Sequence, residues 1–185
     1  MNLLWLLLVA AICAGPALAS EVPAWQRAAI SLYSHESIVI DRPASAVWPF
    51  ILNTDRWKRA LQHRRVSGTA NEIGEVVAES LAAGAAPLFY SETMELVPNV
   101  RRTIKLYPAN GGPLIGFASW ELERDKASTR VTYHVYSESL LTPEDLQAQS
   151  PAQLAAAADS SKAQNQQRFR AELQELKRLV ESSAR

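Results

Sequence analysis

The chain has 185 residues, 48% of them hydrophobic and 21% charged, which is enough for one domain with a sizeable core. Lys+Arg and Asp+Glu both number 19, and the resulting zero net charge excludes the global positive field that favours nucleic-acid binding. Cys13 is the only cysteine, so a disulfide framework and a thiolate metal site are excluded as well.

Residues 1–19, MNLLWLLLVAAICAGPALA, predict a signal peptide. The stretch has no charged side chain and ends in Ala17-Leu18-Ala19, which places small residues at the two positions that signal peptidase reads. We expect cleavage after Ala19, which removes Cys13 and gives an exported, periplasmic protein. The alternative is an uncleaved anchor, although the apolar run Leu3–Ala14 falls short of the ~20 residues that a membrane span needs.

Residues 20–33 are predicted to be an N-terminal connecting segment, in which Trp25, Ala28, Ala29 and Leu32 follow helical spacing. A domain is then expected over residues 34–182. It begins with a strand in which Ile38 and Ile40 share a face, and Pro43 ends that strand. Two short helices are expected next, the first of them containing Pro49, which a helix accommodates if it lies in the first turn.

Strands separated by turn residues fill the middle of the chain. The expected strands are 63–68, 75–81, 88–97, 101–107, 115–124 and 129–137. Because the connections are short, these strands predict an antiparallel sheet. Leu88–Val97 alternates clearly, with Tyr90, Glu92 and Met94 on one face.

The C-terminal part is predicted to be helical. Thr142-Pro143-Glu144-Asp145 favours one helix start, and Ser150-Pro151-Ala152-Gln153 fits a capping box. From there a helix is expected to run to about Ser182, with an interruption at residues 159–161 left open. Its apolar stripe consists of Phe169, Leu173, Leu176 and Val180.

This order of elements, with IVIDRPASAVWPFILNTDRW near its start, resembles the SRPBCC superfamily, the START and birch-pollen-allergen-like helix-grip domains. Ile40, Pro43, Val47, Trp48, Leu52, Asp55 and Trp57 fill much of the superfamily's opening motif. The resemblance implies an α+β fold in which a curved antiparallel sheet of about six or seven strands wraps around a long C-terminal helix. It also implies an apolar cavity between the two.

In such a cavity the inward-facing residues of the sheet and helix would contact a ligand. Glu92 is the candidate catalytic residue, because a carboxylate on an inward face would have a raised pKa suited to acid–base chemistry. Alternatively, it lies at the sheet edge or is neutralised by Arg102. The candidate ligand-binding residues are Ile38, Tyr90, Glu92, Met94, Arg102, Trp120, Tyr133, Phe169 and Leu173.

No metal or cofactor is expected, because His35, His63 and His134 form no pair with the helical spacing of a metal site. Lys58, Arg59, Arg64 and Arg65 are interpreted as a solvated basic face, with peripheral contact to a membrane surface as an alternative.

Three functions remain open. We favour a binding protein for a hydrophobic small molecule, lipid-like or aromatic, over an enzyme. The alternatives are a polyketide cyclase/dehydratase-like enzyme that uses a buried carboxylate, and a structural domain with a filled core.

Overall fold

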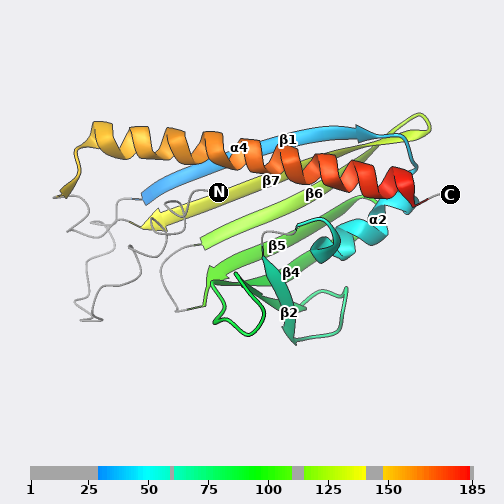
Figure 1. The fold of residues 1–185 in the computed structure, drawn as a ribbon, viewed down its shortest axis with the longest axis horizontal. Helices are drawn as coiled ribbons and strands as arrows, with labels where there is room; N and C mark the ends of the chain where they lie inside the picture. The colour runs from blue at the N-terminus through cyan, green and yellow to red at the C-terminus, as the bar shows by residue number, and fades with distance from the viewer. Residues whose placement is uncertain (1–28, 59–60, 110–114, 141–147, 184–185) are drawn as a thin grey trace.

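The computed structural model describes residues 29–58, 61–109, 115–140 and 148–183. They form one curved antiparallel sheet of seven strands and a long helix packed on its inner face (Figure 1). In chain order the elements are β1 (Ala29–Ile40), α2 (Ala44–Leu52), the 3-10 turn η2 (Thr54–Arg56), β2 (Gln62–Ser67), β3 (Val76–Ser80), β4 (Phe89–Val97), β5 (Arg101–Pro108), β6 (Ile115–Asp125), β7 (Ser128–Leu140) and α4 (Pro151–Ser182). The predicted α+β helix-grip architecture is therefore confirmed.

The strand order explains where the short helices lie. The sheet runs β1-β7-β6-β5-β4-β3-β2, so β1 and β2, although consecutive strands, occupy opposite edges. The segment between them, α2 and η2, must cross the inner face of the sheet, and α2 contacts α4, β6 and β7 on the way. In Figure 1, α2 lies beside the C-terminal end of α4.

The N-terminal boundary differs from the prediction. The first strand begins at Ala29 and pairs with β7 as far back as Leu140, so residues 29–33 belong to the sheet. The helical spacing of Ala29 and Leu32 was misleading because strand pairing with β7 outweighs a weak helical pattern. The predicted signal peptide and its cleavage site lie outside the described residues.

Helix α4 runs unbroken through residues 159–161, which settles the interruption left open above. Its predicted capping box is confirmed: the Ser150 hydroxyl accepts from the Gln153 N–H, and the Gln153 side chain accepts from the Ser150 N–H. The predicted start at residues 142–145 lies outside the described residues.

The core lies between the inner face of the sheet and the apolar stripe of α4. Phe169, Leu173, Leu176 and Val180 are each at most 1% exposed, which confirms the predicted stripe. They pack with residues of α2, of the end of η2 and of the sheet, namely Ile40, Val47, Ile51, Trp57, Ile104, Ala118, Trp120, Leu122, Val131 and Tyr133. Burial of each large side chain contributes about 1.5–3 kcal/mol.

Pro49 lies inside α2, as expected, but beyond its first turn. The helix ends soon after, at Leu52, and its last four carbonyl groups all have partners. Pro49 O accepts from the backbone N–H and from the side chain of Asn53. The other three are satisfied by side chains alone: the Trp57 indole donates to Phe50 O, and Arg102 of β5 donates to Ile51 O and Leu52 O.

Candidate functional site

A pocket of about 140 Å³ lies where α2 and η2 cross the β2–β5 end of the sheet. Its lining comes from the crossing segment, from β2 and the turn after it, and from the inward faces of β3 to β6. The lining residues are Leu52, Asn53, Thr54, Asp55, Lys58, His63, Arg65, Ala70, Asn71, Glu75, Val77, Glu79, Ser91, Arg102, Ile104 and Trp120. Polar and charged side chains dominate this lining, so the pocket differs from the apolar cavity that the resemblance implied.

The space between α4 and the middle of the sheet is filled by stacked aromatic rings. Trp120 and Tyr133 are parallel neighbours with ring centroids 4.9 Å apart, and Phe169 meets Tyr133 edge-on at 4.6 Å. Trp57 packs edge-on against Trp120 at 6.3 Å. These rings are buried, so Tyr133 and Phe169 stabilise the core instead of lining the pocket.

Lys58 reaches from the end of the crossing segment over these rings. Its Nζ donates to the Tyr133 hydroxyl at 2.9 Å and lies 5.1 Å from the Trp120 ring centroid and 4.8 Å from that of Tyr133. Burial alone would lower the pKa of Lys58, but attraction to Tyr133, Glu172 and Glu79 outweighs it, and the pKa is raised. Burial also raises the pKa of Tyr133. At neutral pH an ammonium group therefore faces a neutral phenol.

Arg102 lines the pocket and is held in place by hydrogen bonds to α2 and β4. It is 6% exposed, and its Nη atoms donate to Ile51 O and Leu52 O of α2 and to Thr93 Oγ1 of β4. The Glu75 carboxylate lies 3.9 Å from Nη2. A cation at the negative end of a helix dipole is favourable, so Arg102 ties α2 to the sheet as well as lining the pocket.

His63 and Glu79 face each other across β2 and β3, with Nε2 and Oε2 3.9 Å apart. Burial lowers the pKa of His63, and nearby Lys58 and Arg102 lower it further against the opposing effect of Glu79. The imidazole is therefore neutral at physiological pH.

This lowered pKa predicts a pH-dependent stability. The unfolded chain binds a proton at His63 near the ordinary value of 6.5, whereas the folded chain binds it only at lower pH. Between these two values the unfolded state holds more protons, so stability falls as pH falls. We expect His63→Gln to lose less unfolding free energy than the wild type between pH 7.5 and pH 5.5, measured by urea denaturation. Parallel curves for the two proteins would show that His63 titrates normally.

Three buried polar atoms of pocket-lining residues have no hydrogen-bond partner among the described residues. They are Arg102 Nε, Trp120 Nε1 and His63 Nδ1. Folded proteins rarely leave such atoms unpaired, because each unmade bond costs about 1–3 kcal/mol. All three atoms belong to side chains that line one pocket, which makes this pocket the candidate binding site.

The structure brings only part of the predicted ligand-binding set to this pocket. Arg102 and Trp120 line it, and Tyr133 supports it through Lys58. Phe169 and Leu173 are buried in the core and do not line the pocket, and the half-buried Ile38 packs against the same core. Ile38, Tyr133 and Trp120 do lie on the inner face, as predicted.

Tyr90, Glu92 and Met94 were assigned to the wrong face of β4. The buried residues of that strand are Ser91 and Thr93, and Met94 is 46% exposed at a bulge between Thr93 and Glu95. Apolar character misled the assignment because the inner face lines a polar pocket at this end of the sheet, so small polar residues point inward. Glu92 is therefore not the predicted inward carboxylate, and Arg102 lies on the opposite face from it.

The sequence interpretation missed Lys58, His63, Glu75 and Glu79. Arg64 and Arg65 are exposed, but Lys58 turns onto the aromatic rings, so the basic run is not one solvated face. Arg59 lies outside the described residues. The alternation of Glu75, Val77 and Glu79 was an available signal, since residues two apart on a strand share a face. It would have placed both carboxylates beside Val77.

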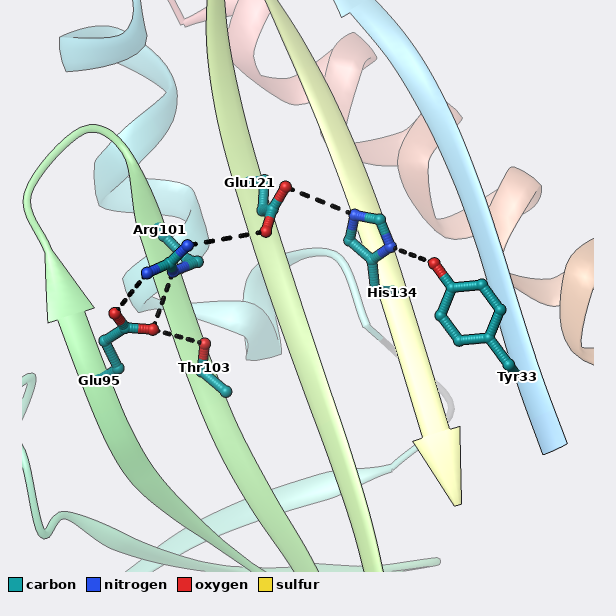
Figure 2. Close-up of polar contacts among 6 residues, drawn as sticks. All are labelled: Tyr33, Glu95, Arg101, Thr103, Glu121 and His134. Carbon is teal, nitrogen blue, oxygen red and sulfur yellow. Dashed lines mark hydrogen bonds and ion pairs between the residues drawn. The ribbon is translucent and has the colours of Figure 1, made fainter. Parts of the chain in front are cut away.

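A separate polar row crosses the outer face of the sheet, and Figure 2 shows it running from β4 to β1. Glu95 accepts from Arg101 at 2.6 Å and from Thr103 at 3.0 Å, and Arg101 lies 3.9 Å from Glu121. His134 lies 3.6 Å from Glu121 and 2.8 Å from the Tyr33 hydroxyl. The strand period of two turns this row away from the pocket, so Arg101 and Arg102 face opposite sides.

Among the described residues, no group of three or more His, Cys, Asp or Glu side chains is arranged to hold a metal ion. No helix in the same ranges is long and apolar enough to cross a membrane.

No protein-family model and no curated protein matches the chain. Solved structures do. The ZhuI aromatase/cyclase from Streptomyces sp. R1128 aligns with a TM-score of 0.61 at 12% identity, covering 84% of this chain and 97% of that one. One part of the di-domain aromatase/cyclase StfQ from the steffimycin biosynthetic pathway aligns with a TM-score of 0.63 at 11% identity, covering 84% of this chain and 52% of StfQ.

Truncated norcoclaurine synthase from Thalictrum flavum aligns with a TM-score of 0.55 at 10% identity, covering 84% of this chain and 96% of that one. At these identities the likeness concerns the fold. Together with the seven-stranded curved sheet, the crossing helices and the long C-terminal helix, it shows that the chain adopts the helix-grip fold.

Proposed function

We propose that this protein binds a ring-sized small molecule in the pocket beneath α2 and η2. The observation that supports this most directly is the set of unpartnered buried atoms on Arg102, Trp120 and His63. A ligand in the pocket would supply the missing partners, and Val77, Ile104 and the Trp120 ring would contact its apolar part.

The volume of the pocket limits the size of the ligand that it can hold. A pocket of about 140 Å³ is close to an engineered cavity of ~150 Å³ that holds benzene in another protein. It is well below the ~300–1,000 Å³ of pockets for drug-sized molecules. The ligand that we propose is thus a small ring compound, and not the lipid that was the other sequence-based expectation. The aromatase/cyclase neighbours support a ring-bearing ligand.

The enzyme alternative loses its stated support, because it relied on Glu92 as a buried acid and Glu92 lies on the outer face. Export remains part of the proposal and is supported by the signal-peptide pattern of residues 1–19. The mature chain would then begin at Ser20.

Mass spectrometry of protein purified under native conditions from the periplasmic fraction tests both points. We expect an intact mass that corresponds to a chain starting at Ser20, and a bound small molecule that is released on denaturation. Ser91→Leu should abolish the bound mass, because Ser91 lines the pocket and is 8% exposed. Ser119→Leu is the matched control, since Ser119 lies beside Thr103 and His134 on the outer face.

Circular dichroism verifies that both variants fold, because overpacking at position 91 costs roughly 1–3 kcal/mol. A ligand retained by Ser91→Leu would place the binding site elsewhere, and wild-type protein without any bound mass would contradict the proposal. If the protein is processed at a position other than Ala19, or retains residues 1–19, the predicted cleavage after Ala19 is wrong. This result would not contradict the binding of a ligand.

A further inference from the structure

The pocket has spare hydrogen-bond donors but no matching spare acceptors. Arg102 Nε and Trp120 Nε1 can only donate, and both are buried without a partner. His63 Nδ1 can take either role. Among the described lining residues, no side-chain oxygen is buried and unpartnered in the same way. The missing group is therefore an acceptor.

Two cations flank the Trp120 indole. Lys58 Nζ lies 5.1 Å from the ring centroid, and Arg102 Cζ lies 5.9 Å from it. An ammonium group has three donors, and one hydrogen bond, to the Tyr133 hydroxyl, is described for Lys58. Lys58, Arg102 and the Trp120 indole thus lie close together, and each has a donor to offer an acceptor group placed near them.

One carboxylate of the pocket, that of Glu75, has close partners: Oε2 accepts from the Asn71 N–H at 3.0 Å and lies 3.9 Å from Arg102. Glu79 Oε2 lies 3.9 Å from His63 Nε2, which is too long for a hydrogen bond. The lining contains three basic side chains besides His63, namely Lys58, Arg65 and Arg102, and three acidic ones, Asp55, Glu75 and Glu79. The charges of the lining therefore balance, and the preference for an acceptor comes from the unpartnered donors of Arg102 and Trp120. A carboxylate accepts from such donors, whereas an amine would meet donor against donor.

We propose that the pocket beneath α2 and η2 takes a planar, ring-sized monoanion, with its carboxylate beside Lys58, Arg102 and the Trp120 indole N–H. This inference rests on the proposed function and specifies the chemical class of the ligand. The ring lies against the apolar walls formed by Val77 and Ile104. The carboxylate receives charge-assisted hydrogen bonds, which are about twice as strong as neutral ones.

Three probes of nearly equal size test the class: benzoate, benzyl alcohol and benzylamine. Each is titrated into the ¹⁵N-labelled mature chain, and the indole N–H resonance of Trp120 is assigned with Trp120→Phe. We expect benzoate to bind roughly tenfold to a hundredfold more tightly than benzyl alcohol, from one or two extra charge-assisted contacts. The Trp120 indole proton should move downfield, and benzylamine should not bind measurably.

Lys58→Met should weaken benzoate binding by roughly tenfold or more and weaken benzyl alcohol binding much less, because the alcohol loses no charge–charge contact. Lys58→Arg, which keeps the charge and donors, should restore most of the benzoate affinity and guards against a folding defect. Lys105→Met is the matched control. Lys105 also lies over an aromatic ring, 5.8 Å from the Tyr107 centroid, but on the outer face beside Glu92.

Different outcomes would contradict the anionic class of the ligand and the binding function of the pocket. If benzyl alcohol or benzylamine binds as tightly as benzoate, or if Lys58→Met and Lys105→Met behave alike, the anion class is wrong while the pocket remains a binding site. If no probe binds and no indole resonance moves, the binding function of this pocket is itself refuted.

Discussion

Replacing Arg102 by methionine is expected to lower the free energy of unfolding by roughly 3–5 kcal/mol, measured by chemical denaturation. The substitution removes the donors to Ile51 O and Leu52 O, which α2 cannot satisfy internally at its C-terminus. It also leaves the Glu75 carboxylate, 7% exposed, without its cation. An uncompensated buried charge is more costly than the loss of the pair itself.

Arg101→Met provides the matched control, because Arg101 is the preceding residue on the same strand but faces solvent in the outer row of Figure 2. It forms a two-pronged contact with Glu95 at 2.6 and 2.8 Å, yet surface ion pairs contribute little. We expect Arg101→Met to change stability far less than Arg102→Met. Equal losses would mean that Arg102 does not anchor α2.

Phe169→Ala is the second substitution with a large expected effect, a loss of about 3–5 kcal/mol. Phe169 is fully buried at the centre of α4, and its ring meets Tyr133 edge-on at 4.6 Å. The cavity left behind would lie next to Tyr133, whose ring stacks on Trp120. Lys58 Nζ lies over both of these rings. Thermal or urea unfolding monitored by far-UV circular dichroism gives the loss.

Phe117→Ala is the corresponding control, since Phe117 lies on the outer face of β6 and is 40% exposed. Its removal creates no closed cavity, so its effect should be much smaller. A small effect at both positions would show that the sheet–helix interface tolerates collapse around position 169. In that case the aromatic stack would not be the rigid support of the pocket.

The sequence predicted helices and strands correctly where a clear local pattern, such as an apolar stripe or a capping box, was present. The stripe of Phe169, Leu173, Leu176 and Val180 identified the buried face of α4, and the Ser150 capping box identified its start. Turn residues separated the strands with boundaries close to the observed ones. The resemblance in residues 34–57 then predicted the helix-grip arrangement, because that order of elements has few other ways to bury its apolar faces.

The prediction of inward-facing residues failed where polar side chains face the inside of the sheet and apolar side chains face solvent. On β4 the inward residues Ser91 and Thr93 are small and polar, and the exposed Met94 is apolar, so alternation indicated the wrong face. The inner face of a sheet is normally apolar because it is dry, but this end lines a polar pocket. The same reasoning error placed Glu92 in the site and left out Glu75 and Glu79.

The sequence by itself determined the secondary structure and the buried stripe of α4, since these follow from local propensity and periodicity, and its resemblance to helix-grip domains indicated the type of fold. Only the tertiary structure decided the site. Lys58 is near Tyr133 and Arg102 is near Ile51 because α2 and η2 must cross from one sheet edge to the other. A contact between residues 51 or 75 positions apart depends on strand order and register, which no local pattern in the chain encodes.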